Sequence, residues 1–348
     1  MKSAGASTYN EIRSQMHVWE QCLDGLSTID LGSFPKGEDF DQIIFVGCGS
    51  TYYLSQWAAR ATQLRTGWSC KAVPSSELWL NPDTWLVPAQ KTLIIAISRS
   101  GSTSETIEAL KMCNQLRNVV SIVVTCYPDS ELAGLTDAVI GLPHAQEESI
   151  AQTRSFTSMM LGVAHLMKNS YPKTLPHRLS EQLSFIVERD KDTASTCGKD
   201  AKISRFFFLG SGSNYGLACE AMLKMKEMSL SYAEAYHFLE FRHGPMSMVD
   251  ANSLVIGLMS PDLISYELSV LHDMKDLGSK VMAIGPAEFE ETHKELDHFI
   301  PIDFDDFAML GDVLYLPILQ LLAYERALAN GHDPDNPNNL SAVVVLES

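Results

Sequence analysis

The sequence of 348 residues lacks the features that define several classes of protein. No apolar run approaches the roughly 18 residues that a membrane-spanning helix needs. The N-terminal stretch has no apolar signal core, so nothing predicts export. The seven cysteines are scattered and form no Cys-x-x-Cys pair, which argues against a zinc site and favours reduced thiols. We therefore expect a cytoplasmic protein that does not associate with membranes.

Positive charge is also scarce, with 26 Lys and Arg residues against 43 Asp and Glu residues and a formal net charge of -17. The absence of a basic stripe excludes nucleic acid as a partner. Because the net negative charge repels anions, an anionic ligand would have to be held by hydrogen-bond donors close to it. His237 and His243 lie six positions apart without a third ligand motif, so we expect no metal and no cofactor.

Buried strands alternate with helical patterns along most of the chain, which predicts an α/β fold with parallel sheets. An amphipathic helix is predicted over 8–27, mostly helical structure over 152–195 and a long apolar helix over 309–329. The predicted strands, which are continuous apolar runs, are 42–47, 91–98, 119–126, 137–143, 204–216, 253–260, 280–286 and 298–303.

An internal repeat divides this pattern in two. The stretch "IIFVGCGSTYYL" (43–54) aligns with "FFFLGSGSNYGL" (206–217), each with a strand, Gly-x-Gly-Ser, a tyrosine and then a helix. Two copies of one α/β unit are the economical interpretation. We expect an N-terminal helical segment (1–35), a first domain (36–175), a second domain (195–330) and a C-terminal tail (331–348).

Hydroxyl side chains are concentrated where the strand 91–98 ends. In "SRSGSTSET" (98–106), six of nine residues are Ser or Thr, and "GCGST" (47–51) ends another strand in the same way. Ligands of parallel sheets bind at the carboxyl ends of the strands, where helix N-termini offer unpaired N–H groups. The two loops therefore predict a cup for a tetrahedral anion, with simple helix capping as the alternative. The second repeat has "GLMSPD" at the matching place, so only one copy keeps the hydroxyl cup.

A second group of candidate functional residues lies in "EAMLKMKE" (220–227). Glu220, Lys224 and Glu227 fall on one helical face, and His243 follows in "FRHGP". A carboxylate and a nearby histidine suit proton transfer. A solvated salt bridge between Glu220 and Lys224 and a structural histidine are the alternatives.

With these motifs and "DNPNNL" in the tail, residues 40–348 resemble the double-SIS (sugar isomerase) family, particularly the isomerase half of glucosamine-6-phosphate synthase and stand-alone deaminases and isomerases. The resemblance implies two flavodoxin-like SIS subdomains, sugar phosphate as substrate and a homodimer with shared active sites. It implies Glu227 as the group that shuttles a proton, Lys224 as its neighbour, and His243 as the ring-opening group, contributed by the neighbouring subunit. The substrate-binding residues it implies are Ser50, Thr51, Ser98, Arg99, Ser100, Thr103, Ile150, Gln152 and Ser341.

Three departures from the family pattern bear on the reaction. We expect no glutaminase domain and therefore no glutamine-dependent amidation. Ala342 stands where the synthase has its Schiff-base lysine. Gln152 and His237 replace small residues and could reshape the pocket. The predicted function is proton transfer between C1 and C2 of a hexose or amino-hexose 6-phosphate, as isomerase or deaminase. The alternatives are a deglycase of glycated amine 6-phosphates, a sulfosugar isomerase and a non-catalytic sensor.

Overall fold

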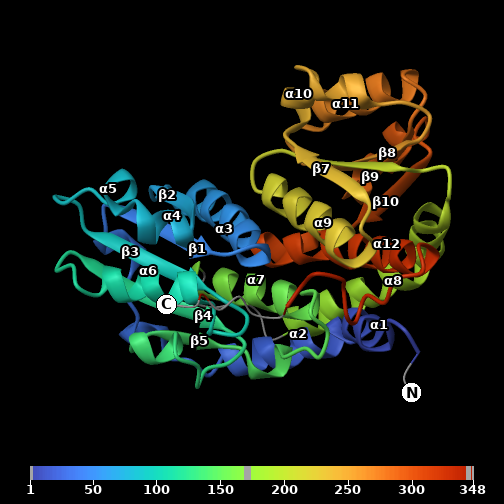
Figure 1. Ribbon diagram of the computed structural model, residues 1–348. Coiled ribbons are helices and arrows are strands. Elements are labelled where there is room, and N and C mark those ends of the chain that lie inside the picture. Colours follow the sequence, from blue (N-terminus) through green and yellow to red (C-terminus); the bar gives the residue numbers. More distant parts are fainter. Residues whose placement is uncertain (1–2, 168–173, 342–345, 347–348) are drawn as a thin grey trace. The chain divides into compact units, whose positions relative to one another are not determined.

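The computed structural model describes residues 3–167, 174–341 and 346. The chain forms two compact units, each built around a five-stranded parallel sheet (Figure 1). The β1–β5 unit consists of His17–Glu147, Arg154–His177 and Ser341–Ser348. The β6–β10 unit consists of Met1–Met16, Glu148–Thr153 and Arg178–Leu340. No helix in the described ranges is long and apolar enough to cross a membrane.

The first sheet has the strand order β2-β1-β3-β4-β5, with every pairing parallel. Its strands are β1 (Gln42–Gly47), β2 (Cys70–Pro74), β3 (Thr92–Ile97), β4 (Val119–Thr125) and β5 (Val139–Gly141). Its helices are α2 (Gln15–Leu26), α3 (Ser50–Thr66), α4 (Ser75–Leu80), α5 (Pro82–Trp85), α6 (Ser104–Cys113) and α7 (Arg154–Met167).

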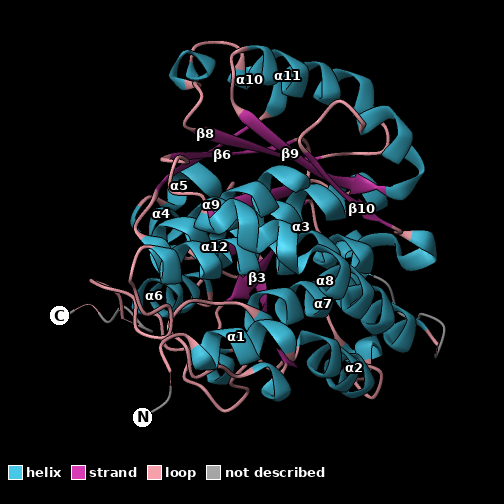
Figure 2. Cartoon of the chain, turned by 90° about the vertical axis from the view of Figure 1, so that its right-hand side faces the viewer, coloured by secondary structure: helices cyan, strands magenta, loops and turns pink. Residues whose placement is uncertain are grey.

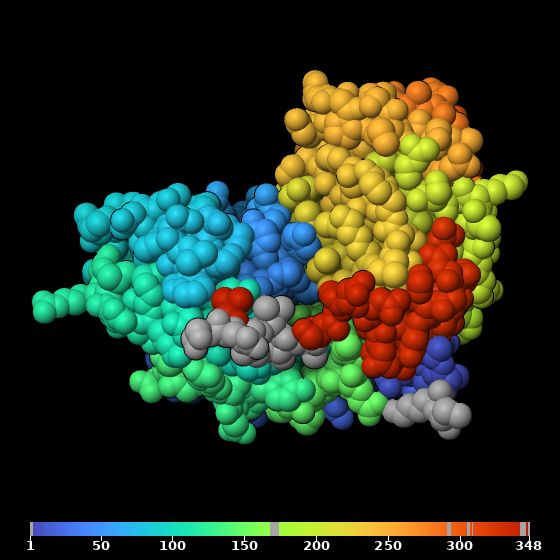
Figure 3. Space-filling view, in the orientation of Figure 1, coloured from blue at the N-terminus to red at the C-terminus, as the bar shows by residue number. Residues whose placement is uncertain are grey.

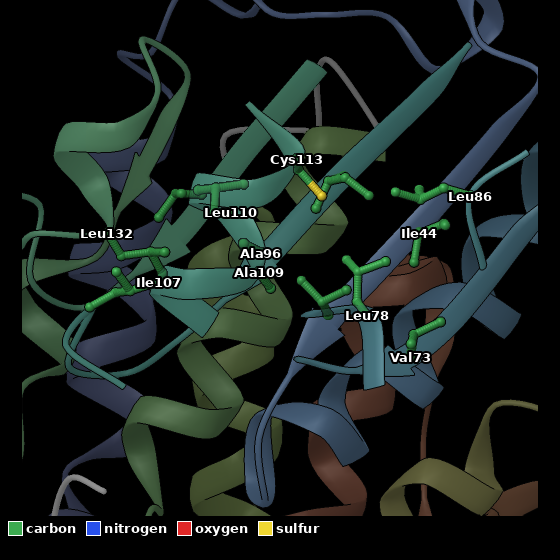
Figure 4. Packing of buried hydrophobic residues seen from close by; sticks show 13 residues of the cluster. Ile44, Val73, Leu78, Leu86, Ala96, Ile107, Ala109, Leu110, Cys113 and Leu132 are labelled. Carbon is green, nitrogen blue, oxygen red and sulfur yellow. The ribbon is translucent and has the colours of Figure 1, made fainter. Parts of the chain in front are cut away.

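Both faces of this sheet are covered, which explains why its central strands are apolar at every position. Helices α4 and α6 pack together on one face, where Ile44 and Ala96 meet Leu78 and Leu110 (Figure 4). Helices α3 and α7 pack against each other on the opposite face. The helices that follow β1 and β3 therefore leave the sheet on opposite sides, so the β1/β3 boundary is the topological switch point at which ligands bind in such sheets.

The second sheet has the order β10-β9-β8-β6-β7 and lies between α9 and α12 on one face and α10 and α11 on the other (Figure 2). Its strands are β6 (Arg205–Gly210), β7 (Tyr232–Tyr236), β8 (Ser253–Leu258), β9 (Lys280–Pro286) and β10 (His298–Ile302). The helices of this unit are α1 (Ala6–Arg13), α8 (Leu175–Lys199), α9 (Asn214–Ser229), α10 (Phe238–Phe241), α11 (Ile264–Asp276) and α12 (Leu316–Ala329).

The two sheets share one topology. Numbering the strands within each unit gives 2-1-3-4-5 in both cases, the flavodoxin-like order. The α/β class, the parallel sheets and the duplicated architecture predicted from the sequence are confirmed.

Three local predictions were wrong, and two strands were missed. The strand predicted over 204–216 ends at Gly210, and α9 already begins at Asn214. The helix predicted over 8–27 is interrupted at Ser14, whose hydroxyl donates to the Glu11 carbonyl, so α1 and α2 are separate. The first part of the helix predicted over 309–329 is a 3-10 helix, Asp305–Tyr315, and α12 starts just before Pro317. The sequence analysis also missed β2 and β7, the strand next to the first strand in each repeat.

Candidate active site

The two hydroxyl-rich loops follow neighbouring strands. β1 pairs with β3, and α3 and α6 begin directly after the loops that leave these strands. A contact of 3.6 Å between Cys48 Sγ and Thr106 Oγ1 links the β1 loop to α6. The loops turn on Gly49 and Gly101, whose φ values of 56° and 62° suit glycine. Both helix N-termini therefore lie at the switch point of the first sheet.

Helix capping does not account for the hydroxyl groups. The N-cap of α3 is Gly49, and Thr103, the N-cap of α6, makes no side-chain capping bond. Instead, the buried Ser98 hydroxyl accepts from Gly101 N–H at 3.2 Å and lies 3.4 Å from the Thr103 hydroxyl. The Ser100 hydroxyl also accepts from Ser102 N–H at 3.2 Å. Both Ser98 and Ser100 therefore hold the shape of the loop, while Ser100 and Thr103 keep part of their surface accessible.

The positive charge of Arg99 is already paired with a carboxylate of the chain. Its guanidinium lies 3.6 Å from the Glu147 carboxylate, and the two side chains are 9% and 0% exposed. Its carbonyl accepts from Cys126 N–H and the Thr125 hydroxyl, which ties the β3 loop to the end of β4. An anion at this loop would meet hydroxyls and helix N-termini beside an already neutralised arginine.

Nearby Ser50 and Thr51 are buried in the first turn of α3. The Thr51 hydroxyl accepts from Cys48 N–H and lies within hydrogen-bond distance of the Cys48 carbonyl, both at 2.9 Å. Burial raises the pKa of the Cys48 thiol, so this cysteine is protonated at neutral pH. The loop therefore offers polar donors and no thiolate.

The helix α9 carries a buried cluster of charge. Lys224 Nζ lies 3.4 Å from Glu220 Oε1 and bonds directly to the Glu227 carboxylate. The side chains of Glu220 and Lys224 are each 1% exposed, whereas that of Glu227 is 18% exposed. The solvated salt bridge considered for Glu220 and Lys224 is therefore wrong. Only the Glu227 end of this cluster reaches the surface, so it is the end that a substrate can touch.

The Lys224 ammonium is stabilised by its two carboxylates. Burial alone would lower the pKa of Lys224, but the charges of Glu220 and Glu227 and the hydrogen bonds to them outweigh it and raise that pKa. The lysine is therefore a fixed cation, and it orients the Glu227 carboxylate.

The remaining predicted residues lie apart from this cluster along the chain. His243 is on an exposed turn after α10, and its side chain has no bonded partner in the part of the chain that the structure describes. Ile150 and Gln152 lie in the segment Glu148–Thr153 of the β6–β10 unit, and Gln152 Oε1 is buried without a hydrogen-bond partner in the described ranges. Ser341 is exposed, and Ala342 lies outside the described residues.

His237, flagged as a departure from the family, stacks on Tyr215 with ring centroids 3.9 Å apart. Each ring belongs to the segment that follows a strand of the second sheet, β6 for Tyr215 and β7 for His237. Within the described ranges, no three His, Cys, Asp or Glu side chains are grouped as metal ligands would be.

The second repeat places a carboxylate of the chain itself where the first repeat has its hydroxyl cup. Ser260, after β8, donates its N–H to Glu267 at 2.6 Å and its hydroxyl at 3.1 Å. Glu267 is 1% exposed. A carboxyl group of the chain itself thus occupies the strand ends of the second sheet.

We expect Glu267→Ala to destabilise the β6–β10 unit by about 1–3 kcal/mol, because it leaves the Ser260 donors without their acceptor. Burial raises the pKa of Glu267 above its ordinary value of 4.5. The stability linked to this proton is present below pH 4.5 and is lost as pH rises through the folded pKa. The cost of the substitution, measured by urea unfolding, should therefore be larger at pH 4.5 than at pH 8. An equal cost at both would contradict this assignment.

Sequence reasoning missed Glu147 and Glu267. Both lie in polar stretches that look solvated, "HAQEES" and the start of α11, and no local pattern marks them as buried. Only the packing of the loops shows that these carboxylates are enclosed.

Comparison with known proteins agrees with this architecture. The SIS domain matches residues 38–167 and 200–323, and the chain belongs to the SIS domain family. A glutamine–fructose-6-phosphate aminotransferase of Methanothermobacter thermautotrophicus is 27% identical over 344 residues, which are 97% of this chain and 55% of that protein. The chain thus spans about half the length of such curated relatives.

Two solved structures are similar over nearly their whole length. The tagatose-6-phosphate ketose/aldose isomerase of Escherichia coli has a TM-score of 0.87 at 26% identity, covering 97% of this chain and 96% of that one. A glucosamine-6-phosphate deaminase of Thermotoga maritima has a TM-score of 0.79 at 28% identity, covering 98% of this chain and 100% of that one. The fold is therefore that of SIS phosphosugar isomerases and deaminases.

Proposed function

We propose that this protein is an enzyme that moves a proton between C1 and C2 of a hexose or amino-hexose 6-phosphate. The observation that carries the proposal is the buried cluster on α9, in which Lys224 orients a single accessible carboxylate, Glu227. A binding protein would gain nothing from a buried lysine between two carboxylates, because burial of charge is costly. An oriented carboxylate suits the removal of a proton next to a carbonyl group.

In this proposal the phosphate binds the hydroxyls and helix N-termini after β1 and β3, the loops that carry Thr51, Ser98, Ser100 and Thr103. His243 passes a proton between the ring oxygen and the C1 hydroxyl and so opens the sugar. The Glu227 carboxylate takes the proton from C2 of the open aldose, giving an enediol, and returns it to C1 while the O2 proton moves to O1. The product is the ketose. With an amino sugar, the same proton transfer gives an iminium at C2 that water hydrolyses to ammonia and ketose.

The experiment is incubation with glucosamine 6-phosphate, galactosamine 6-phosphate, fructose 6-phosphate, tagatose 6-phosphate and a glycated amino acid phosphate, scoring ammonia and ketose–aldose conversion. Exchange with deuterated water of the C2 proton of the amino sugars, and of a C1 proton of the ketoses, is followed in parallel by NMR. Formation of an aldose from fructose 6-phosphate or tagatose 6-phosphate identifies an isomerase, and ammonia from an amino sugar identifies a deaminase. Binding of a sugar phosphate without either exchange would contradict the proposal and identify a sensor.

Replacing Ser100 by alanine is expected to raise KM about tenfold and to leave kcat nearly unchanged. The partly exposed hydroxyl would bind the phosphate in ground state and transition state alike, and one such hydrogen bond is worth about 1.4 kcal/mol. Ser33→Ala, which removes an exposed hydroxyl elsewhere in the same unit, is the control. The Kd of inorganic phosphate, measured by calorimetry, should rise with KM. An unchanged Kd would place the anion elsewhere.

A further inference from the structure

The segment Glu148–Thr153 is held by an unusual set of buried polar side chains. Glu11 of α1 is 3% exposed and accepts from Glu148 N–H at 2.5 Å, from Ser149 N–H at 3.3 Å and from the Ser149 hydroxyl. At the other end, Gln320 of α12 donates to the Thr153 carbonyl at 3.2 Å. Gln320 in turn accepts from buried Gln15 at 2.9 Å. The six-residue segment is thus fixed at both ends by side chains distant in sequence.

The same helix, α1, is bound by the C-terminal tail. Asp335 accepts from the N–H groups of Ser7 and Thr8 at 3.0 and 2.7 Å and from the Thr8 hydroxyl at 2.7 Å. Asp333 accepts from Gly5 N–H at 2.8 Å. Figure 3 shows the red C-terminal residues against the dark-blue N-terminal ones. These carboxylates satisfy the N–H groups at the start of α1 and favour its dipole.

The tail and the start of α1 each contact the segment directly. Ile150 N–H lies 3.4 Å from the Asp335 carbonyl, and the Ser7 hydroxyl donates to the Glu148 carboxylate at 2.9 Å. Helix α1, the tail and the segment therefore form one hydrogen-bonded assembly within the β6–β10 unit. Breaking any one of the three contacts would loosen the other two.

We infer that α1 is a clamp that holds Ile150 and Gln152 in the geometry needed for the sugar and couples them to Asp333 and Asp335 of the tail. Glu11 is the central positioning residue, because its single carboxylate engages two backbone N–H groups and one hydroxyl of the segment. This inference rests on the proposed function for the role of Ile150 and Gln152, and on the hydrogen bonds alone for the clamp.

The test compares Glu11→Ala with Glu11→Gln. Glutamine keeps one oxygen for the two N–H groups and can donate its amide to the Ser149 hydroxyl, so it should preserve the clamp. Glu267→Ala is the matched control, because it also removes a buried carboxylate that binds the N–H and hydroxyl of one serine, without contact to the segment. If Glu11→Ala does not fold, Ser149→Ala is used instead. It removes one of the hydrogen bonds to Glu11, so it should change the hydrogen exchange of the segment and the KM in the same direction but by less.

The first measurement, hydrogen exchange of peptides covering 148–153, needs no substrate. We expect exchange to accelerate at least tenfold in Glu11→Ala and in Asp335→Ala, and to stay within about threefold of the unsubstituted protein in Glu11→Gln and Glu267→Ala. Unchanged exchange in Glu11→Ala would overturn the clamp, whatever the catalytic activity.

The second measurement is KM and the ratio of kcat/KM for two hexose epimers. Loss of folded protein lowers kcat equally for every substrate and leaves KM unchanged, whereas a displaced segment raises KM and changes the epimer ratio. We expect KM to rise about tenfold in Glu11→Ala, to rise also in Asp335→Ala, and to stay unchanged in Glu11→Gln and Glu267→Ala. Wild-type KM and epimer ratio in Glu11→Ala would overturn the positioning role. If the unsubstituted protein converts no sugar phosphate, the proposed function fails, and hydrogen exchange still decides whether the clamp exists.

Discussion

Replacing Glu227 by glutamine is expected to lower kcat for the conversion of the sugar phosphate by about 10²–10⁴-fold, the usual contribution of a general base. Glutamine has nearly the same shape and keeps an oxygen for Lys224, but it cannot accept the proton from C2. KM should change little, because the residues proposed to bind the phosphate lie in other loops. Steady-state kinetics and the rate of C2 proton exchange in deuterated water measure the two effects.

The control for this prediction is Glu288→Gln, which changes the net charge equally at an exposed position of the same unit. It should retain the turnover of the unsubstituted protein. C2 exchange and turnover should fall together in Glu227→Gln, since both require the same proton transfer. A variant that exchanged the C2 proton at the original rate would show that another group is the base, and the role of Glu227 would have to be abandoned.

The architecture could be predicted from the sequence because the central strands are buried on both faces and are therefore apolar at every position. The same reasoning could not find β2 and β7. Both are edge strands with one neighbour, and their sequences, "CKAVP" and "YAEAY", mix exposed and buried positions. The other two edge strands, β5 and β10, were predicted, so the charged and small residues within β2 and β7 hid them, and not their edge position alone.

The candidate site was predictable where chemistry depends on local sequence, and unpredictable where it depends on packing. Hydroxyls and glycines after β1 and β3 are visible in the sequence because the backbone there needs them. The spacing of Glu220, Lys224 and Glu227 gave their common face but not their burial, since α12 covers α9 only in the folded unit. Glu11 and Glu267 bind donors in distant segments, so no window of sequence contains both partners.

Replacing Lys224 by methionine is expected to destabilise the β6–β10 unit by about 3–5 kcal/mol, because it leaves the buried Glu220 carboxylate without its ammonium. Methionine fills a similar volume, so little of the loss would come from a cavity. Since a protonated carboxylic acid needs no cation, the deficit should shrink when the protein is acidified. Urea unfolding of both proteins at pH 8 and pH 5, followed by circular dichroism, measures this difference.

Two further variants separate charge from packing. Lys226→Met, at the exposed position two residues along α9, should change stability by less than about 0.5 kcal/mol. Glu220→Gln combined with Lys224→Met removes both members of the pair and should recover much of the loss, as replaced buried ion pairs often do. The raised pKa of Lys224 also predicts how stability changes at alkaline pH. Its pKa is raised on folding, so its contribution is intact below the ordinary value of 10.5 and is lost as pH rises through the folded pKa. The unsubstituted protein should therefore lose stability above pH 10.5 more steeply than Lys224→Met. If Lys224→Met were as stable as the unsubstituted protein at pH 8, the buried charges of Glu220 and Lys224 would not stabilise each other. Lys224 would then not be the fixed cation that orients Glu227.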